Sequence, residues 1–234
     1  MFRAALIWVF VLLVSPASAQ DIVKSADFAD PTKRYDHGIL GDAIEYGEMV
    51  ITLTNDARVL IHLPEERVFE DISPRVVDLD NDGAPEIVVV ETDVNLGARL
   101  SVYGSQGLIT ATPHIGRSYR WLAPIGAADL DGDGYVEIAY IDRPHLAKLL
   151  KIWRYKDGKL TLAAEQGGLT NHQIGQDFIS GGIRDCGAGP QMITASSDWS
   201  EIVASVFDGE EIRFAAIGEH KGQNSFKRAL DCRM

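Results

Sequence analysis

The sequence predicts an all-β protein built from repeated units of four short strands. Two runs, DLDNDGAPEIVVV from Asp78 and DLDGDGYVEIAYI from Asp129, are copies of one pattern that begin 51 residues apart. Nearly all of the chain after residue 40 consists of short apolar runs, rich in β-branched residues and separated by turn residues. Hairpin turns recur at matching places, at 105–107, 156–158 and 208–209. A four-stranded unit of roughly 50 residues is the size of a β-propeller blade, so a small β-propeller is expected.

The repeating element is a strand that ends in aspartate. It occurs before Asp78, Asp129, Asp185 and Asp231, at spacings of 51, 56 and 46 residues. Each of the first three copies is followed by about three further strand-like runs. One of these, 148–155, could be read as a basic amphipathic helix, but its side chains alternate and an Asp-Gly turn follows, so a strand is predicted.

The two ends of the chain determine how the propeller closes. Three strands, at 48–54, 58–63 and 67–70, precede the first complete unit and have no clear inner strand of their own. The last copy ends just after Asp231, so we expect the C-terminal strand 229–231 to complete the first blade and close a ring of four blades. The alternative is five blades, with 38–42 (GILGD) as a further inner strand.

Residues 1–19 have the pattern of a signal peptide. Arg3 precedes an apolar stretch, and Ala17-Ser18-Ala19 forms a small-residue cleavage site. The apolar stretch is too short to span a bilayer, so no membrane insertion is expected. The mature chain, 20–234, is predicted to be one exported domain in the periplasm or the external medium.

The charge of the chain argues against nucleic acid and anionic lipid as partners. The formal net charge is −12, and removal of residues 1–19 takes away only Arg3, which leaves −13.

Two cysteines, Cys186 and Cys232, each follow an aspartate in similar local sequences. In an exported protein this pattern predicts a disulfide, with two buried free thiols as the alternative.

The two aspartate runs have the side chains of a calcium loop. Each has carboxylates at positions 1, 3, 5 and 9 and a glycine at position 6; the carboxylates are Asp78, Asp80, Asp82 and Glu86, then Asp129, Asp131, Asp133 and Glu137. Ca²⁺ takes about six to eight oxygen ligands, and like charges at this spacing repel one another unless a cation neutralises them. An EF-hand is excluded, because position 12 holds Val89 and Tyr140 instead of glutamate. Two structural Ca²⁺ sites are therefore expected; the alternative is an acidic turn satisfied by backbone N–H groups.

These loops, each followed by an apolar strand, resemble the FG-GAP/VCBS repeat family, which includes the integrin α-chain propeller and many exported bacterial proteins. The resemblance covers about 74–155. It implies a β-propeller that binds Ca²⁺ in the eight-carboxylate set and serves in adhesion, ligand binding or scaffolding. The third copy departs from the pattern, because Cys-Gly-Ala-Gly follows Asp185, so no metal is expected there.

No catalytic constellation is evident in the sequence. The six histidines have no zinc-ligand spacing, and no G-x-S-x-G elbow is present. The sequence therefore favours a non-enzymatic binding or scaffold module for a protein or glycan partner, with a polysaccharide hydrolase or lyase on the same scaffold as the alternative. Arg117, Tyr119, Arg120 and Trp121 form a cluster that fits either a binding surface or packing between blades.

Overall fold

The structure is a computed structural model that describes residues 21–234, and within them it contains seventeen strands and one helix. The predicted signal peptide, 1–19, lies outside the described residues. Among the residues described, no helix is long and apolar enough to cross a membrane.

The strands form four antiparallel units that follow one another along the chain. The first contains β1 (Val23–Thr32), β2 (Glu45–Leu53) and β3 (Arg58–His62); β4 (Arg67–Phe69) joins it to the second, pairing with β2 at one residue and with β6 (Glu86–Asp93) at three. The second contains β5 (Arg75–Val77), β6, β7 (Gly97–Gly104) and β8 (Gly107–Ala111). The third contains β9 (Leu122–Ala128), β10 (Glu137–Asp142), β11 (Leu149–Lys156) and β12 (Lys159–Gly167). The fourth contains β14 (Gly182–Asp185), β15 (Pro190–Ser196), β16 (Glu201–Phe207) and β17 (Ile212–Glu219), with the short β13 (Leu169–Thr170) paired to β15.

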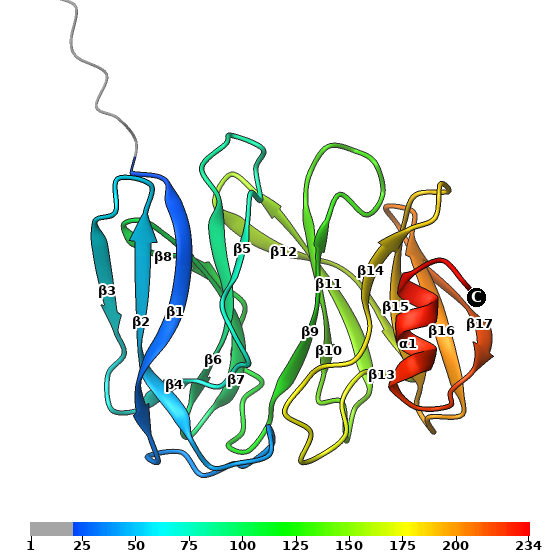
Figure 1. Ribbon diagram of the computed structural model, residues 1–234, viewed down its shortest axis with the longest axis horizontal. Coiled ribbons are helices and arrows are strands. Elements are labelled where there is room, and N and C mark those ends of the chain that lie inside the picture. The colour runs from blue at the N-terminus through cyan, green and yellow to red at the C-terminus, as the bar shows by residue number, and fades with distance from the viewer. Residues whose placement is uncertain (1–20) are drawn as a thin grey trace, which may run out of the picture.

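The units stand side by side in chain order, and the first and fourth lie at opposite ends of the molecule (Figure 1). The first two units share one sheet, because β4 pairs with both β2 and β6. The three repeats predicted after residue 70 are confirmed, each as four strands, and the segment 148–155 is a strand, β11. The all-β prediction is confirmed, and the arrangement fits a β-propeller-like fold.

The predicted closing strand at 229–231 is wrong. This segment lies at the end of the only helix among the described residues, α1 (Gln223–Leu230), which packs on the last sheet through Phe226 and Ala229. No sheet among the described residues closes on itself. The segment 38–42, expected in the five-blade alternative to form a strand, consists of turns and bends.

The first unit takes its inner strand from the N-terminal side. β1 pairs with β2 from Val23–Leu53 to Thr32–Glu45. The Phe28 ring stacks on the rings of Tyr46 and Phe69, with centroids 5.4 and 5.2 Å away. Because β1 satisfies the edge of β2, a C-terminal strand is not needed there.

The core lies between the units, in three successive layers. In β6, Ile87 and Val89 pack toward the first unit, whereas Val88 and Val90 pack toward the third. The same alternation in β10 divides its side chains between the second and fourth units. Both faces of each strand are therefore covered, which explains why the runs after the acidic loops are continuously apolar.

The predicted disulfide between Cys186 and Cys232 is confirmed, with the two Cα atoms 5.7 Å apart. Cys186 follows β14 and Cys232 follows α1, so the bond holds the C-terminal helix to the end of the inner strand. The Arg184 guanidinium also donates to the carbonyl oxygen of Ala229.

We expect the Cys186→Ser/Cys232→Ser double variant to lose stability, because the bond closes a loop with a sequence separation of 46 residues. Chain entropy alone gives a loss of about 4 kcal/mol. Chemical denaturation of the oxidised wild type and the double variant measures it. Equal midpoints would show that α1 is held by its packing alone.

Glu45, at the start of β2, is a buried carboxyl. Burial, together with the negative charge of Glu70, raises its pKa to about 9. Between the ordinary carboxyl value and this pKa, the folded chain holds a proton that the unfolded chain has released. Because the unfolded state then binds fewer protons, the free energy of unfolding falls as pH rises.

Glu45→Gln should therefore remove a pH dependence of stability. Relative to this variant, the wild type should lose up to about 1.4 kcal/mol per pH unit between pH 6 and 8. Urea denaturation of both proteins at pH 6, 7 and 8, in chelator throughout, gives the difference. A difference that stays constant with pH would contradict a neutral buried carboxyl at this position.

Candidate metal loops and ligand pocket

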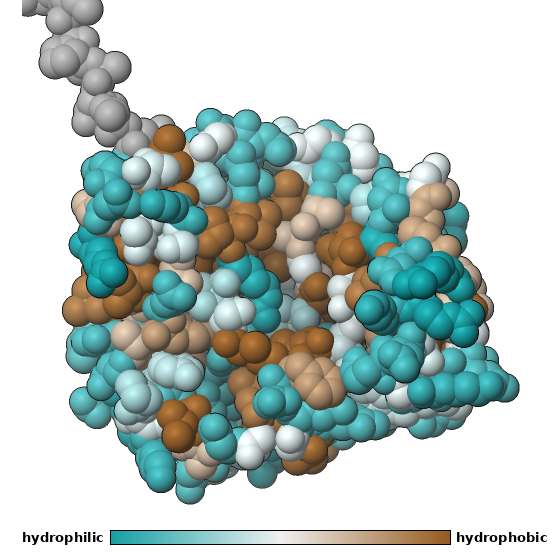
Figure 2. All heavy atoms as spheres, in the orientation of Figure 1, coloured by the Kyte–Doolittle hydropathy of each residue, from teal (hydrophilic) through white to brown (hydrophobic). Residues whose placement is uncertain are grey.

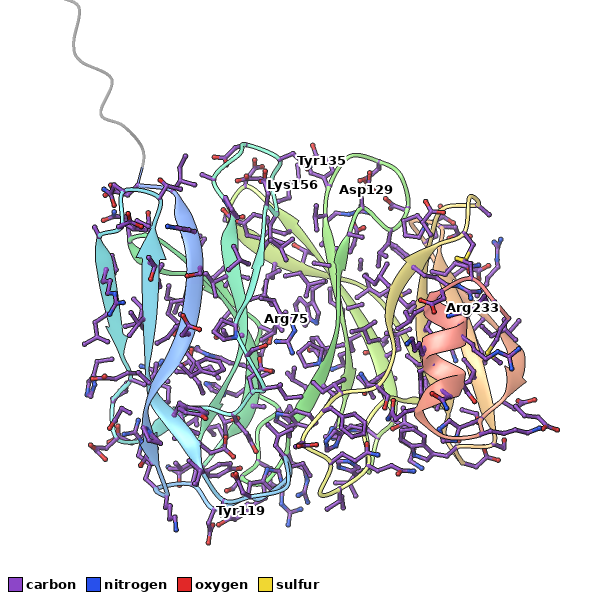
Figure 3. All side chains as sticks on the ribbon, viewed as in Figure 1. Arg75, Tyr119, Asp129, Tyr135, Lys156 and Arg233 are labelled. Atoms are coloured by element: carbon purple, nitrogen blue, oxygen red, sulfur yellow. A yellow bond between two sulfur atoms is a disulfide. The ribbon has the colours of Figure 1, made fainter. Side chains whose placement is uncertain are left out.

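The two acidic loops lie at the same edge of the molecule. The first loop, 78–86, connects β5 to β6, and the second loop, 129–137, connects β9 to β10. The Asn81 side chain of the first lies 3.5 Å from the carbonyl oxygen of Gly134 in the second. In Figure 3, Asp129 and Tyr135 mark this edge, whereas Tyr119 lies at the opposite one.

Both loops have the same backbone conformation at two positions. Positions 4 and 6 have positive φ in each: 60° at Asn81 and 85° at Gly83, then 79° at Gly132 and 92° at Gly134. A Cβ added to either position-6 glycine would meet no atom within 4 Å. Glycine is therefore favoured there because of the positive φ and not because a side chain would clash.

Carboxylates then fix the turn from within. Asp78 accepts the N–H of Gly83 at 3.0 Å, and Asp129 accepts that of Gly134 at the same distance. The glutamates at position 9, Glu86 and Glu137, also act alike, since each accepts a backbone N–H from the residue after the first aspartate at 2.9 Å.

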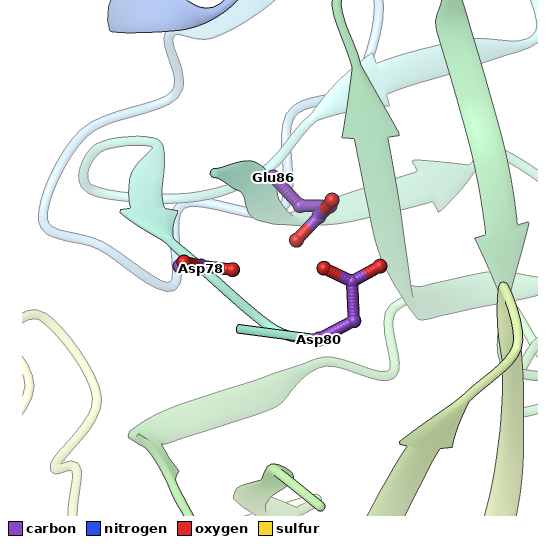
Figure 4. A group of neighbouring side chains, drawn as sticks. All are labelled: Asp78, Asp80 and Glu86. Carbon is purple, nitrogen blue, oxygen red and sulfur yellow. The ribbon is translucent and has the colours of Figure 1, made fainter. Parts of the chain in front are cut away.

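The first loop brings together Asp78, Asp80 and Glu86, whose carboxylates offer oxygens within 4.8 Å of one another. Figure 4 shows the three carboxylates pointing toward a common space. Asp82, also a predicted ligand, is outside this group and accepts the N–H of Ala84 at 2.7 Å. Burial, followed by the charge of Asp82, raises the pKa of Asp80, and burial also raises that of Glu86. The loop therefore holds negative charge that a cation would stabilise, and its oxygen donors fit a hard divalent ion.

The second loop groups Asp129, Asp131 and Glu137 in the same way. Here, however, the chain supplies a cation of its own. The Arg154 guanidinium, from β11, pairs with Asp131, with Asp133 at 3.1 Å and with Glu137 at 2.7 Å. The two loops thus have the same carboxylates in different electrostatic surroundings.

A pocket at the opposite edge was not predicted as a unit. It is a cavity of about 240 Å³ whose walls come from four separate segments: His37, Ile39, Tyr119, Arg120, Trp121, Arg143, Pro144, His145, Leu146 and Ile174. Residues of the sequence cluster at 117–121 differ in their exposure here. Trp121 is 2% exposed and packs between units, as the packing alternative holds, whereas Tyr119 is 47% exposed and lines the cavity.

The Tyr119 ring is held in place before any ligand arrives. Its backbone has a φ of 55°, its N–H donates to the Tyr35 hydroxyl at 2.6 Å, and its own hydroxyl donates to Asp36 at 2.8 Å. The two tyrosine rings stack with centroids 5.2 Å apart. Such a conformation persists only where neighbours fix it, so this ring is a preorganised part of the pocket.

The net charge of the pocket comes mainly from one arginine. Burial lowers the pKa of His145 to about 4, so this side chain is neutral at physiological pH. Arg143 is paired with the buried Asp142. Arg120 makes no ion pair within residues 21–234 and donates only to the carbonyl oxygen of Tyr119.

Comparison with known families gives one match. Residues 78–140, from the first loop to β10, match the family model described as an FG-GAP-like repeat. This confirms the family resemblance over the segment that contains both acidic loops. No curated protein matches the chain.

Proposed function

We propose that the mature chain is an exported, calcium-stabilised, propeller-like module that binds a protein or glycan partner and does not catalyse a reaction. The observation that carries this proposal is the preformed pocket, in which the exposed Tyr119 ring stands beside the unpaired Arg120. Export is supported by the disulfide, which forms in oxidising compartments, and by the predicted leader.

Calcium is the ion that best suits the first loop. Its donors are carboxylate oxygens, the hard ligands that Ca²⁺ prefers, and the left-handed positions let the backbone wrap around a centre. The role is structural: Asp78, Asp80 and Glu86 would hold the ion between the inner strand and the second strand of a unit. Loops in exported modules bind with a Kd of about 10⁻⁴ to 10⁻³ M.

The charges around the pocket favour binding over glycoside hydrolysis. Hydrolysis requires two carboxyl groups that face the scissile bond, yet none of the described residues that line the pocket carries a carboxylate. Two buried carboxyls lie behind residues of the wall. Asp142 is paired with Arg143 and Lys151. Glu70 lies 2.5 Å from His37 Nδ1 and accepts the Thr92 hydroxyl with its other oxygen. Both of its oxygens are thus engaged with the protein.

The walls of the pocket suggest the chemistry of the group that enters it. An exposed aromatic face beside a guanidinium recognises a ring, or an apolar side chain, with an adjoining negative charge. A uronic acid residue of a glycan has both features, and so does an acidic peptide with an apolar residue.

Ca²⁺ should raise the melting temperature of the mature protein. At ten times the Kd, binding stabilises the folded state by about 1.4 kcal/mol, which corresponds to roughly 3–6 °C for a domain of this size. Thermal unfolding in millimolar Ca²⁺ and in chelator measures the shift. Asp80→Asn should abolish it, while Asp157→Asn, in an exposed hairpin turn, should leave it intact. A melting temperature that does not change with Ca²⁺ would mean that backbone N–H groups alone satisfy the carboxylates of the loop.

Binding should depend on Tyr119 and Arg120. We expect Tyr119→Ala and Arg120→Ala each to weaken binding by about tenfold or more, because each removes an anchor of the pocket. Calorimetric titration with uronic-acid oligosaccharides, neutral oligosaccharides and acidic peptides identifies the partner class. Arg117→Ala, on the same segment but outside the pocket, is the matched control. Turnover of a polysaccharide, or equal losses in all three variants, would count against the proposal.

A further inference from the structure

We propose that Arg154 is the resident cation of the second loop, so that the chain binds one divalent ion, in the first loop, and not two. This inference rests on the calcium site proposed above for the first loop. It concerns how residues of the chain itself make the second loop differ from the first. The matching carboxylate groups by themselves would suggest an ion in each loop.

The hydrogen bonds of the second loop leave no oxygen of its ligand group unused. Asp129 accepts N–H groups from Gly132 and Gly134 with its two oxygens. Asp131 accepts from Asp133 N–H with one oxygen and pairs with Arg154 through the other. Glu137 accepts from Leu130 N–H with Oε2 and from Arg154 Nε with Oε1. The guanidinium thus occupies the side on which the carboxylates converge.

The first loop has similar internal bonds, without the guanidinium; they differ in that Asp78 Oδ1 accepts from the fifth residue of the loop, whereas Asp129 Oδ1 accepts from the fourth. Asp78 accepts N–H groups from Asp82 and Gly83, and Glu86 Oε2 accepts from Leu79. Among the described residues, Asp80 Oδ2 and Glu86 Oε1 accept no hydrogen bond and make no ion pair; their counterparts in the second loop are the two oxygens that Arg154 meets. The oxygens available to an ion in one loop are therefore those neutralised by the chain in the other.

The strand register shows that the presence of a guanidinium in only one loop depends on one position. In the third unit, Glu137 pairs directly with Arg154 across β10 and β11. In the second unit, Ile87 pairs with Tyr103, and one further step of the same register places Gly104 opposite Glu86. Gly104 has no side chain to reach the loop. The space beside it is a cavity of about 210 Å³ that both Glu86 and Gly104 line.

The fixed charge also makes the second loop a poor site for an added ion. Arg154 is held by three carboxylates, and its side chain is 26% exposed. A divalent ion would have to displace the guanidinium, or bind beside a like charge in partly buried surroundings, and either cost lowers its affinity.

Reciprocal variants test the inference. Calorimetric titration of the mature, disulfide-bonded protein with Ca²⁺ should give one site, lost in Asp80→Asn and kept in Asp131→Asn. Arg154→Gln, which keeps most of the side-chain stem, should give two sites. Gly104→Arg should lose the first site; the added Cβ would lie 3.0 Å from Ile109 Cδ1, at the end of a flexible, exposed side chain that can move aside. Lys227→Ala, which removes an exposed positive charge on α1, in the fourth unit, should still give one site.

The outcomes separate this inference from the calcium proposal. Two sites in the wild type, or one site in a folded Arg154→Gln variant, would overturn the role of Arg154 and leave calcium binding in place. No binding to the wild type or to Arg154→Gln would overturn the calcium site itself, and the inference with it. Melting in chelator establishes that each variant is folded. If Arg154→Gln does not fold, Gly104→Arg decides: a retained first site would contradict the inference.

Discussion

Each inner unit of this protein lies between two others, and its apolar side chains are covered only when both neighbours are in place. Alternate residues of β6 pack into different core layers, and β10 repeats the arrangement one unit later. Neither inner unit therefore has a core of its own, and stability is shared between neighbours, as in other repeat architectures. The two outermost units then need protection. In the fourth unit, α1 covers apolar side chains from β15 and β16 and exposes a hydrophilic surface (Figure 2).

The interior repeats could be predicted from the sequence because their signals are local. Short apolar runs, turn residues and a fixed spacing determine β5–β12, and nothing distant opposes them. The chain ends differ. The run at 229–231 looks like the earlier strands before aspartate, yet Phe226 and Ala229 are three residues apart and share the buried side of α1. β1 was not predicted, because polar side chains interrupt Val23, Ala26 and Phe28, the residues that pack on the first unit.

The candidate sites, too, could be predicted only where the contacts lie within one short segment of the chain. Spacing predicted the six carboxylates that lie close together, three in each loop, but it also included Asp82 and Asp133, which lie outside these groups. Arg154 comes from a neighbouring strand, and its role depends on the register between β10 and β11, which the sequence pattern did not settle. The pocket depends on four separate segments that meet only in the folded protein. For 119–121 the sequence left a binding surface and packing between blades as alternatives, and only tertiary packing decides that Trp121 is buried while Tyr119 is exposed.

The turn after the inner strand is reinforced differently in each of the last three units. In the second unit, Asp80 and Glu86 each leave one oxygen without a partner among the described residues; in the third, Arg154 pairs with the two matching carboxylates. In the fourth, Asp185 still accepts the N–H groups of Gly187 and Gly189, but the next residue is Cys186, which is bonded to Cys232. One turn geometry is thus combined with unpaired carboxylate oxygens, an internal ion pair or a covalent bond. Only the first of these leaves the loop open to the surroundings of the protein. Glu86 also lines a cavity that it shares with Asp21 and Val23, where β1 begins, at the end of the described chain that has neither helix nor disulfide.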